Sequence, residues 1–115
     1  MRGEAVRARA VQPIRDGRLR FGDGWQFDCN TLRLKNPAGD DVELTMHERD
    51  LLRAFIAAPQ RALSRDHLAQ ATRTHGTNVT RKVEAQIYRL RRKLPGIIQT
   101  RDGEGYVFAV RVESA

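Results

Sequence analysis

One stretch of the sequence, residues 78–95, combines helical periodicity with concentrated positive charge. Its large apolar side chains recur at spacings of four, three and four residues, which places them on one stripe of an α-helix. These side chains are Val83, Ile87, Leu90 and Leu94. Asn78 or Thr77 can serve as the N-cap, and Pro95 ends the helix. The pattern predicts a helix over about residues 79–94 whose apolar stripe faces a core.

The opposite face of this helix carries most of the charge. At about 100° per residue, the side chains that point away from the stripe are Arg81, Ala85, Tyr88, Arg89 and Arg92, flanked by Lys82, Glu84, Arg91 and Lys93. Residues 61–95 hold nine Arg and Lys against two acids, a local net charge of +7. This equals the net charge of the whole chain. Charge gathered on one helix is typical of a phosphate-binding surface. A solvated basic helix that binds nothing shows the same pattern.

Length and composition indicate one soluble globular domain. The chain has 115 residues, of which 40% are hydrophobic and 30% charged, enough to form a single core. Cys29 has no second cysteine to pair with, which fits a reducing compartment. The sequence has neither an apolar run near the roughly 18 residues of a membrane span nor a signal-peptide core at its start. We therefore expect a cytoplasmic protein without a membrane partner.

The first part of the chain predicts a tail followed by a sheet. Residues 1–16 are rich in Arg and Ala and are interrupted by Pro13, which indicates a linker or tail. Four short segments with apolar residues at every second position follow, separated by turn-forming sequences. Their apolar pairs are Leu19 and Phe21, Trp25 and Phe27, Leu32 and Leu34, and Val42 and Leu44. They predict a four-stranded antiparallel sheet over residues 17–44.

Two helices are predicted between this sheet and the basic helix. The sequence from Thr45 to Glu48 matches a capping box, in which each side chain satisfies the other residue's backbone N–H. Apolar residues then follow at helical spacing until Pro59. Ser64 is a second N-cap, and it begins a short helix that runs to about Thr72.

The end of the chain predicts a β-hairpin. Residues 97–101 and 106–112 are apolar, β-branched or aromatic runs on either side of Asp102-Gly103-Glu104-Gly105. The order is a sheet, three helices over residues 45–95 and a hairpin over residues 96–112. This is an α+β fold with the order of a winged helix-turn-helix.

Catalytic and metal-binding patterns find no support. His47, His67 and His75 lack metal-ligand spacing with any Cys or acid cluster. The glycines near Asp102 belong to no phosphate-binding pattern, and Asp40-Asp41 lies in a turn unsuited to acid–base catalysis. We expect a protein that is not an enzyme and that uses neither a metal ion nor a cofactor.

Three segments carry a resemblance to a known family: VELTMHERDLLRAFIAAPQRALSRDHL, RKVEAQIYRLRRKL and IIQTRDGEGYVF. Together they resemble the DNA-binding effector domain of OmpR/PhoB-type response regulators over roughly residues 17–112. In that family the third helix enters a major groove, and the hairpin is a wing that reaches an adjacent minor groove. The resemblance implies sequence-specific binding to double-stranded DNA and transcriptional regulation in a bacterial two-component phosphorelay.

The resemblance also implies roles for individual residues. The positions that approach base edges are Glu84, Ala85 and Arg89, and those that contact the DNA backbone are Arg81, Gln86, Tyr88, Arg91 and Thr100. The helical wheel adds Lys82 and Arg92 to the backbone contacts. Arg101 joins them because Asp102 stands where the family often has a minor-groove arginine.

Further partners follow from the family. A loop between the second and third helices contacts RNA polymerase in relatives, and its shorter counterpart here is Arg73, Thr74, His75 and Gly76. We expect a receiver domain before residues 1–16, and a domain that is monomeric alone and paired on DNA repeats. Two alternatives stay open, namely a winged-helix protein-interaction module and a non-specific double-stranded RNA binder.

Overall fold

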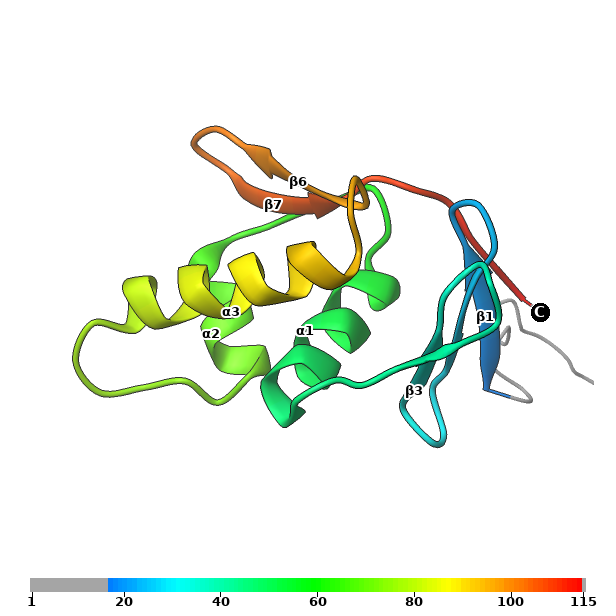
Figure 1. Ribbon diagram of the computed structural model, residues 1–115. Coiled ribbons are helices and arrows are strands. Elements are labelled where there is room, and N and C mark those ends of the chain that lie inside the picture. The colour runs from blue at the N-terminus through cyan, green and yellow to red at the C-terminus, as the bar shows by residue number, and fades with distance from the viewer. Residues whose placement is uncertain (1–16, 115) are drawn as a thin grey trace, which may run out of the picture. The chain divides into compact units, whose positions relative to one another are not determined.

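A computed structural model of the chain describes residues 17–114 (Figure 1). The predicted tail, residues 1–16, lies outside the described residues. The described chain forms two compact units, one made of residues 17–43 with residues 112–114 and the other of residues 44–111. Within residues 17–114, none of the helices combines the length and the apolar character that a membrane span needs.

The first unit is an antiparallel sheet. Its strands are β1 (Arg18–Phe21), β2 (Trp25–Asp28), β3 (Arg33–Lys35), β4 (Asp41–Val42) and β8 (Val112–Ser114), in the spatial order β4-β3-β2-β1-β8. Leu19 pairs with Phe27, which in turn pairs with Leu34, so that one face carries a row of buried side chains. The predicted alternation of apolar and polar residues is therefore confirmed for these strands.

Leu32 was expected in a strand, but it lies in the turn before β3 with a φ of 60°. The Asp28 carboxylate causes this turn, because its Oδ1 accepts hydrogen bonds from the backbone N–H groups of Asn30 at 2.8 Å and Thr31 at 3.2 Å. Such a local side-chain bond competes with strand pairing. Leu44, also expected in a strand, follows β4 and is buried at the start of the second unit.

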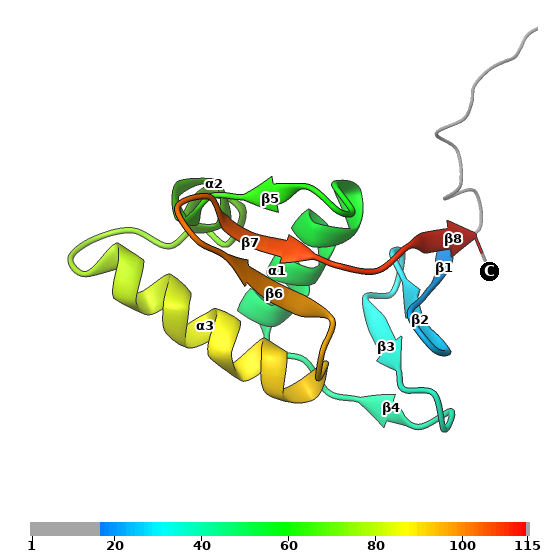
Figure 2. The same ribbon diagram turned by 90° about the horizontal axis from the view of Figure 1, so that it is seen from above.

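The second unit contains three helices and a small sheet, and it confirms the winged helix-turn-helix fold (Figures 1 and 2). The helices are α1 (Met46–Ala57), α2 (Arg65–Ala71) and α3 (Val79–Lys93), and the strands are β5 (Ala62–Leu63), β6 (Ile98–Arg101) and β7 (Gly105–Phe108). The β6–β7 hairpin is the wing. Figure 2 shows it running beside α3, with β5 along its other edge.

Strand β5 is an addition that the sequence pattern does not predict. It pairs Leu63 with Tyr106 and Ala62 with Val107, which makes the wing part of a three-stranded sheet. Gly105 permits this close approach, because a Cβ there would collide with the backbone carbonyl of Leu63. The wing is thereby attached to the segment that leads into α2.

The C-terminal end of the wing also differs from the prediction, which continued the hairpin to Val112. Strand β7 ends at Phe108, and the last pairing beyond it is the Ala109 N–H donating to the Ile97 carbonyl at 2.8 Å. Because β6 begins only at Ile98, no strand remains beside the following residues. The chain instead pairs with β1 as β8, so the N-terminal sheet has five strands rather than four.

The first two helices begin as predicted. The Thr45 hydroxyl accepts from the Glu48 N–H at 3.2 Å, and the Glu48 carboxylate accepts from the Thr45 N–H at 2.8 Å, which completes the capping box. The Ser64 hydroxyl likewise caps α2 by accepting from the His67 N–H at 3.0 Å. Asn78 is the N-cap of α3, but its φ is 57° and its side chain makes no capping bond. The short α2–α3 loop uses left-handed residues to reverse direction, so Asn78 lacks the extended backbone that side-chain capping needs.

The inner stripe of α3 lies in the core as predicted. Its four apolar side chains are at most 1% exposed. They are Val83, Ile87, Leu90 and Leu94. Helix α3 packs against both α1 and α2, and Phe55 of α1 stacks against Phe108 of β7 with ring centroids 6.2 Å apart. One core therefore joins α3 to the other helices and to the wing.

Truncating this stripe is expected to destabilise the second unit strongly. Leu90→Ala should lower the free energy of unfolding by about 2–5 kcal/mol, because a fully buried leucine leaves a cavity. Chemical denaturation followed by circular dichroism measures the loss. Arg92→Ala, at an exposed position of the same helix, is the matched control and should change stability by less than about 0.5 kcal/mol. Equal losses from the two variants would mean that the helix faces are assigned backwards.

Candidate nucleic-acid interface

Helix α3 presents a basic outer face opposite the buried stripe. Arg81, Arg89 and Arg92 are exposed, Tyr88 is 62% exposed, and the small Ala85 lies half-buried between them. The Arg92 guanidinium lies over the Tyr88 ring, 5.9 Å from its centroid. Because the two residues are four positions apart on a helix, this contact holds both side chains on the outer surface.

Two arginines on this face are available for a ligand. Among residues 17–114, the side chain of neither Arg81 nor Arg89 forms a hydrogen bond or an ion pair. Their guanidinium groups offer several donors each to an anionic or hydrogen-bonding surface. Ala85 lies one turn before Arg89, and its short side chain lets another molecule approach the helix backbone there.

One flank of α3 faces the wing, and polar contacts bridge the two. Arg91 donates from Nη1 to the Thr100 hydroxyl of β6 at 3.0 Å. The structure thus brings together two residues that the family resemblance assigns to the DNA backbone. Glu84, from the same flank, accepts from Arg65 Nε of α2 at 3.0 Å. The sequence analysis gave Arg65 no functional role.

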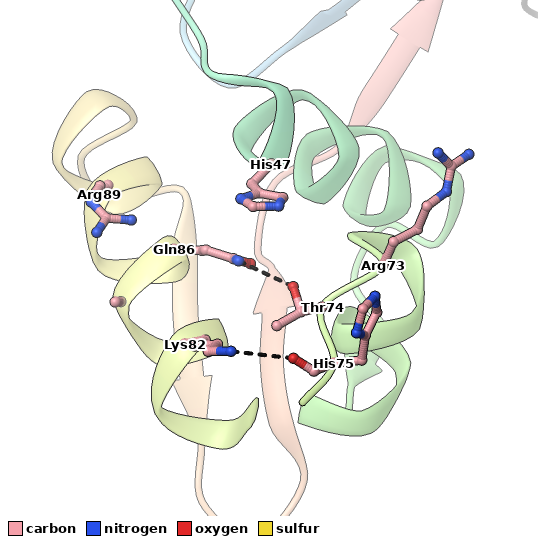
Figure 3. A pocket seen from close by; sticks show the side chains of 8 residues that line it. His47, Arg73, Thr74, His75, Lys82, Gln86 and Arg89 are labelled. Carbon is pink, nitrogen blue, oxygen red and sulfur yellow. Dashed lines mark hydrogen bonds between the residues drawn. The ribbon is translucent and has the colours of Figure 1, made fainter. Parts of the chain in front are cut away.

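The other flank of α3 faces the α2–α3 loop, and Figure 3 shows the two contacts that join them. Lys82 Nζ donates to the His75 carbonyl at 3.2 Å, and Gln86 Nε2 donates to the Thr74 hydroxyl at 3.1 Å. An open hollow of about 410 Å³ lies here. Its lining residues are His47, Arg73, Thr74, His75, Lys82, Ala85, Gln86 and Arg89.

Gln86, which the family resemblance assigns to the DNA backbone, is buried in the structure. The residue is 5% exposed, and its amide points to the loop rather than outward. Its Oε1 has no hydrogen-bond partner among the described residues. The position lies between the buried stripe and the loop flank, so the helix packing draws it inward. Its observed role is to connect α3 to Thr74.

The predicted polymerase-contact loop is compact. Arg73 has a φ of 56° and is exposed, and Gly76 has a φ of 95°. The Thr74 hydroxyl lies 2.6 Å from that of Thr72, and the His75 carbonyl accepts from Lys82. The loop's side of α3 is therefore tied to the helix by polar contacts, while the Arg73 and His75 side chains remain exposed.

The C-terminal end of α3 is joined to α1 by a partly buried ion pair. Lys93 Nζ lies 2.6 Å from Glu48 Oε1, and the Glu48 residue is only 2% exposed. The same carboxylate completes the capping box with Thr45. Sequence reasoning missed this pair, although Glu48 stands on the apolar stripe of α1, four residues before Leu52 and seven before Phe55. An acid in such a position signals a buried partner.

The environment of Glu48 favours its charged form. Burial by itself raises the pKa of a carboxyl group. Here the hydrogen bond and charge of Lys93 and the hydrogen bonds with Thr45 outweigh burial, so the pKa of Glu48 is lowered from its ordinary 4.5. The ion pair therefore fixes the end of α3 against the start of α1 near neutral pH.

This lowered pKa makes a prediction for stability against pH. The unfolded chain binds a proton at Glu48 more readily than the folded chain does, because the pKa of Glu48 is lower in the folded state. The free energy of unfolding therefore decreases as the pH is lowered from 4.5 through the folded pKa. Glu48→Gln should be less stable than the parent near pH 7, and the gap should narrow as the pH falls below 4.5. Urea denaturation between about pH 3 and pH 7 measures it. A gap that stays constant over this range would contradict the assignment.

The tip of the wing is exposed and acidic. Asp102, Gly103 and Glu104 form the turn between β6 and β7, and the Glu104 N–H donates to the Arg101 carbonyl at 2.9 Å. Arg101 is exposed and follows Thr100 in β6, so the two side chains leave opposite faces of the strand.

Within residues 17–114, no three His, Cys, Asp or Glu side chains gather where they could hold a metal ion.

The fold and this surface define a winged helix-turn-helix domain with a basic helix open to a polyanion. A family model described as "Transcriptional regulatory protein, C terminal" matches residues 39–108. The chain belongs to this family, which confirms the resemblance to OmpR/PhoB-type effector domains. It is a family of transcription regulators rather than of enzymes.

Relatives with known names support this assignment. The regulatory protein VirG of Agrobacterium tumefaciens is 38% identical over 96 residues, covering 77% of this chain and 36% of VirG. The transcriptional regulatory protein AruR of Pseudomonas aeruginosa is 36% identical over 110 residues, covering 90% of this chain and 45% of AruR. The chain thus spans less than half the length of either relative.

A solved structure matches the same fold. It is the Klebsiella pneumoniae RstA DNA-binding domain in complex with the RstA box. Its TM-score with this chain is 0.70 at 27% sequence identity, and the match covers 80% of this chain and 96% of that one.

Proposed function

We propose that this domain binds double-stranded DNA sequence-specifically and regulates transcription as the output domain of a two-component response regulator. The observation that carries the proposal is the outer face of α3, where Arg81 and Arg89 are exposed and without partners among the described residues. An α-helix fits the major groove of B-DNA, where the base edges of each pair differ. The fold match to the RstA domain, solved in complex with the RstA box, supports this use of the helix.

The proposal assigns the residues of this surface either to base edges or to the DNA backbone. Arg89, Ala85 and Glu84 approach base edges, with Arg89 donating two hydrogen bonds to O6 and N7 of guanine. The backbone contacts are Arg81, Lys82, Tyr88, Arg91, Arg92, Thr100 and Arg101. Arg91 and Thr100 already touch each other, so one phosphate can receive donors from both the helix and the wing.

The partners of the whole protein belong to the same proposal. The chain spans less than half of VirG and of AruR, which supports a receiver domain N-terminal to the tail. The exposed loop with Arg73 and His75 is proposed to contact RNA polymerase. The domain acts in the bacterial cytoplasm, is monomeric by itself, and pairs on repeated DNA sites.

Substitutions on α3 test the proposal. Arg89→Ala should lose preference at one base pair, expected to be G·C, because a bidentate arginine contributes about 1–3 kcal/mol of discrimination. Arg81→Ala should weaken binding to all sequences alike and make the dependence of log affinity on log salt shallower by about one phosphate contact. Binding-site selection from a random duplex library, with titrations at several salt concentrations, measures both effects.

The parent protein supplies the control for the function itself. Selection of one DNA motif supports sequence-specific binding, whereas equal binding to duplex RNA and random DNA would support a non-specific binder. An affinity that does not change with salt would favour a protein-interaction module. The same motif at full strength from the Arg89→Ala protein would remove the base-reading role from Arg89.

The wing makes a second prediction. Asp102→Arg should tighten DNA binding and steepen its salt dependence, because the change removes an anion near the phosphates and adds a cation suited to a minor groove. Fluorescence anisotropy with one duplex at fixed salt measures the affinity. Asp23→Arg makes the same charge change in another exposed turn, between β1 and β2, and is the matched control. Equal tightening by both variants would attribute the gain to net charge and not to the wing.

A further inference from the structure

The wing flank of α3 contains a contact that the proposed function does not use. Arg65, at the start of α2, donates from Nε to Glu84 Oε2 at 3.0 Å. Glu84 is one of the three residues proposed to approach base edges. Its other oxygen, Oε1, accepts no hydrogen bond from the described residues. One half of the carboxylate is therefore held by the protein, and the other half is open.

Arg65 is itself held in place by the wing. Its guanidinium lies over the Tyr106 ring, 5.1 Å from the centroid, and Nη2 lies 3.4 Å from the Tyr106 hydroxyl. Tyr106 is 5% exposed and pairs with Leu63 in the three-stranded sheet. The ring is thus a rigid platform, and a planar guanidinium stacks on such a surface better than an ammonium group does. Through its contacts with Tyr106 and Glu84, Arg65 joins α2, the wing and α3.

We propose that Arg65 is a positioning residue that fixes the Glu84 carboxylate so that Oε1 faces a base edge. This inference rests on the proposed function, since it concerns which base α3 reads. A glutamate on an exposed helix face otherwise samples many rotamers and is repelled by phosphates. Pairing with Arg65 removes both disadvantages, because the carboxylate gains one orientation and a neutralising charge.

The chemistry of the open oxygen defines the base. Oε1 of an ionised carboxylate only accepts hydrogen bonds, so it suits the N4 amino group of cytosine or the N6 amino group of adenine. Guanine presents two acceptors, O6 and N7, at the same edge, and these repel a carboxylate. Arg65 therefore affects specificity without touching DNA. It holds Glu84 where the carboxylate accepts a hydrogen bond from a base amino group and is repelled by guanine.

Binding-site selection with the full chain tests the inference. Glu84→Ala first identifies the base pair that Glu84 reads, as the position where preference is lost. Arg65→Ala should then reduce discrimination at that same base pair, by about tenfold, and leave the position read by Arg89 unchanged. Arg61→Ala is the matched control, because it removes one exposed arginine four residues earlier and should leave the motif intact.

Arg65→Lys separates positioning from charge neutralisation. The lysine keeps the positive charge, so overall affinity should stay close to that of the parent, but it cannot stack a planar fork on Tyr106 and should still lose discrimination at the Glu84 position. Thermal unfolding of each variant checks that it is folded. Because Arg65→Lys preserves charge and most of the side chain, it keeps the test decisive if Arg65→Ala fails to fold.

Three results would overturn the inference while the proposed function stands. They are an unchanged motif with Glu84→Ala, an unchanged motif with uniformly weaker binding for Arg65→Ala, and a fully restored motif with Arg65→Lys. A parent protein that selects no motif would instead refute the proposed function, and the inference with it. We expect all three variants, Glu84→Ala, Arg65→Ala and Arg65→Lys, to lose preference at one shared base pair. Arg65→Lys should in addition retain the overall affinity of the parent.

Discussion

Burial of the inner stripe of α3 determines which of its residues can meet another molecule. Ile87 and Leu90 are at most 1% exposed, and together they set the rotation of the helix about its own axis. A change of one residue in phase would turn the helix by about 100° and move the exposed Arg89 towards the core. The hydrophobic effect has no directional preference of its own. The helical spacing of the apolar residues determines which face of α3 it buries. The basic outer face is a consequence of this packing.

Polar contacts on both flanks then refine the position that the core sets. On the loop flank, Lys82 and Gln86 bond to the α2–α3 loop, and on the wing flank Arg91 bonds to Thr100. The partly buried pair of Lys93 with Glu48 holds the C-terminal end. The contacts between exposed side chains, such as that of Arg91 with Thr100, contribute little to stability individually. Their value lies in orientation, because reading a base edge demands positions accurate to a fraction of an ångström.

Features that depend on neighbouring residues were predictable from the sequence, and features that depend on distant pairing were not. The capping box at Thr45 and the stripe of α3 follow from spacings within one turn or one helix. Strand β8 and strand β5 exist because separate segments meet in space, and short strands carry little signal of their own. Gln86 shows a related limit within the site, because the family resemblance implied a contact with the DNA backbone, whereas its amide bonds to Thr74, a loop residue that the spacing within the helix does not predict.

The distribution of charge on α3 shows how one helix can serve both structure and binding. Lys82, Arg91 and Lys93 each bond to another part of the second unit, whereas Arg81 and Arg89 keep their donors open among the described residues. All five charges contribute to the long-range field that attracts a polyanion. Only side chains that can reach a phosphate or a base form direct contacts with DNA. The net charge of +7 therefore does not give the number of these contacts. Of the two arginines without partners among the described residues, Arg89 is the one proposed to distinguish one DNA sequence from another, and Arg81 is proposed to contact a phosphate.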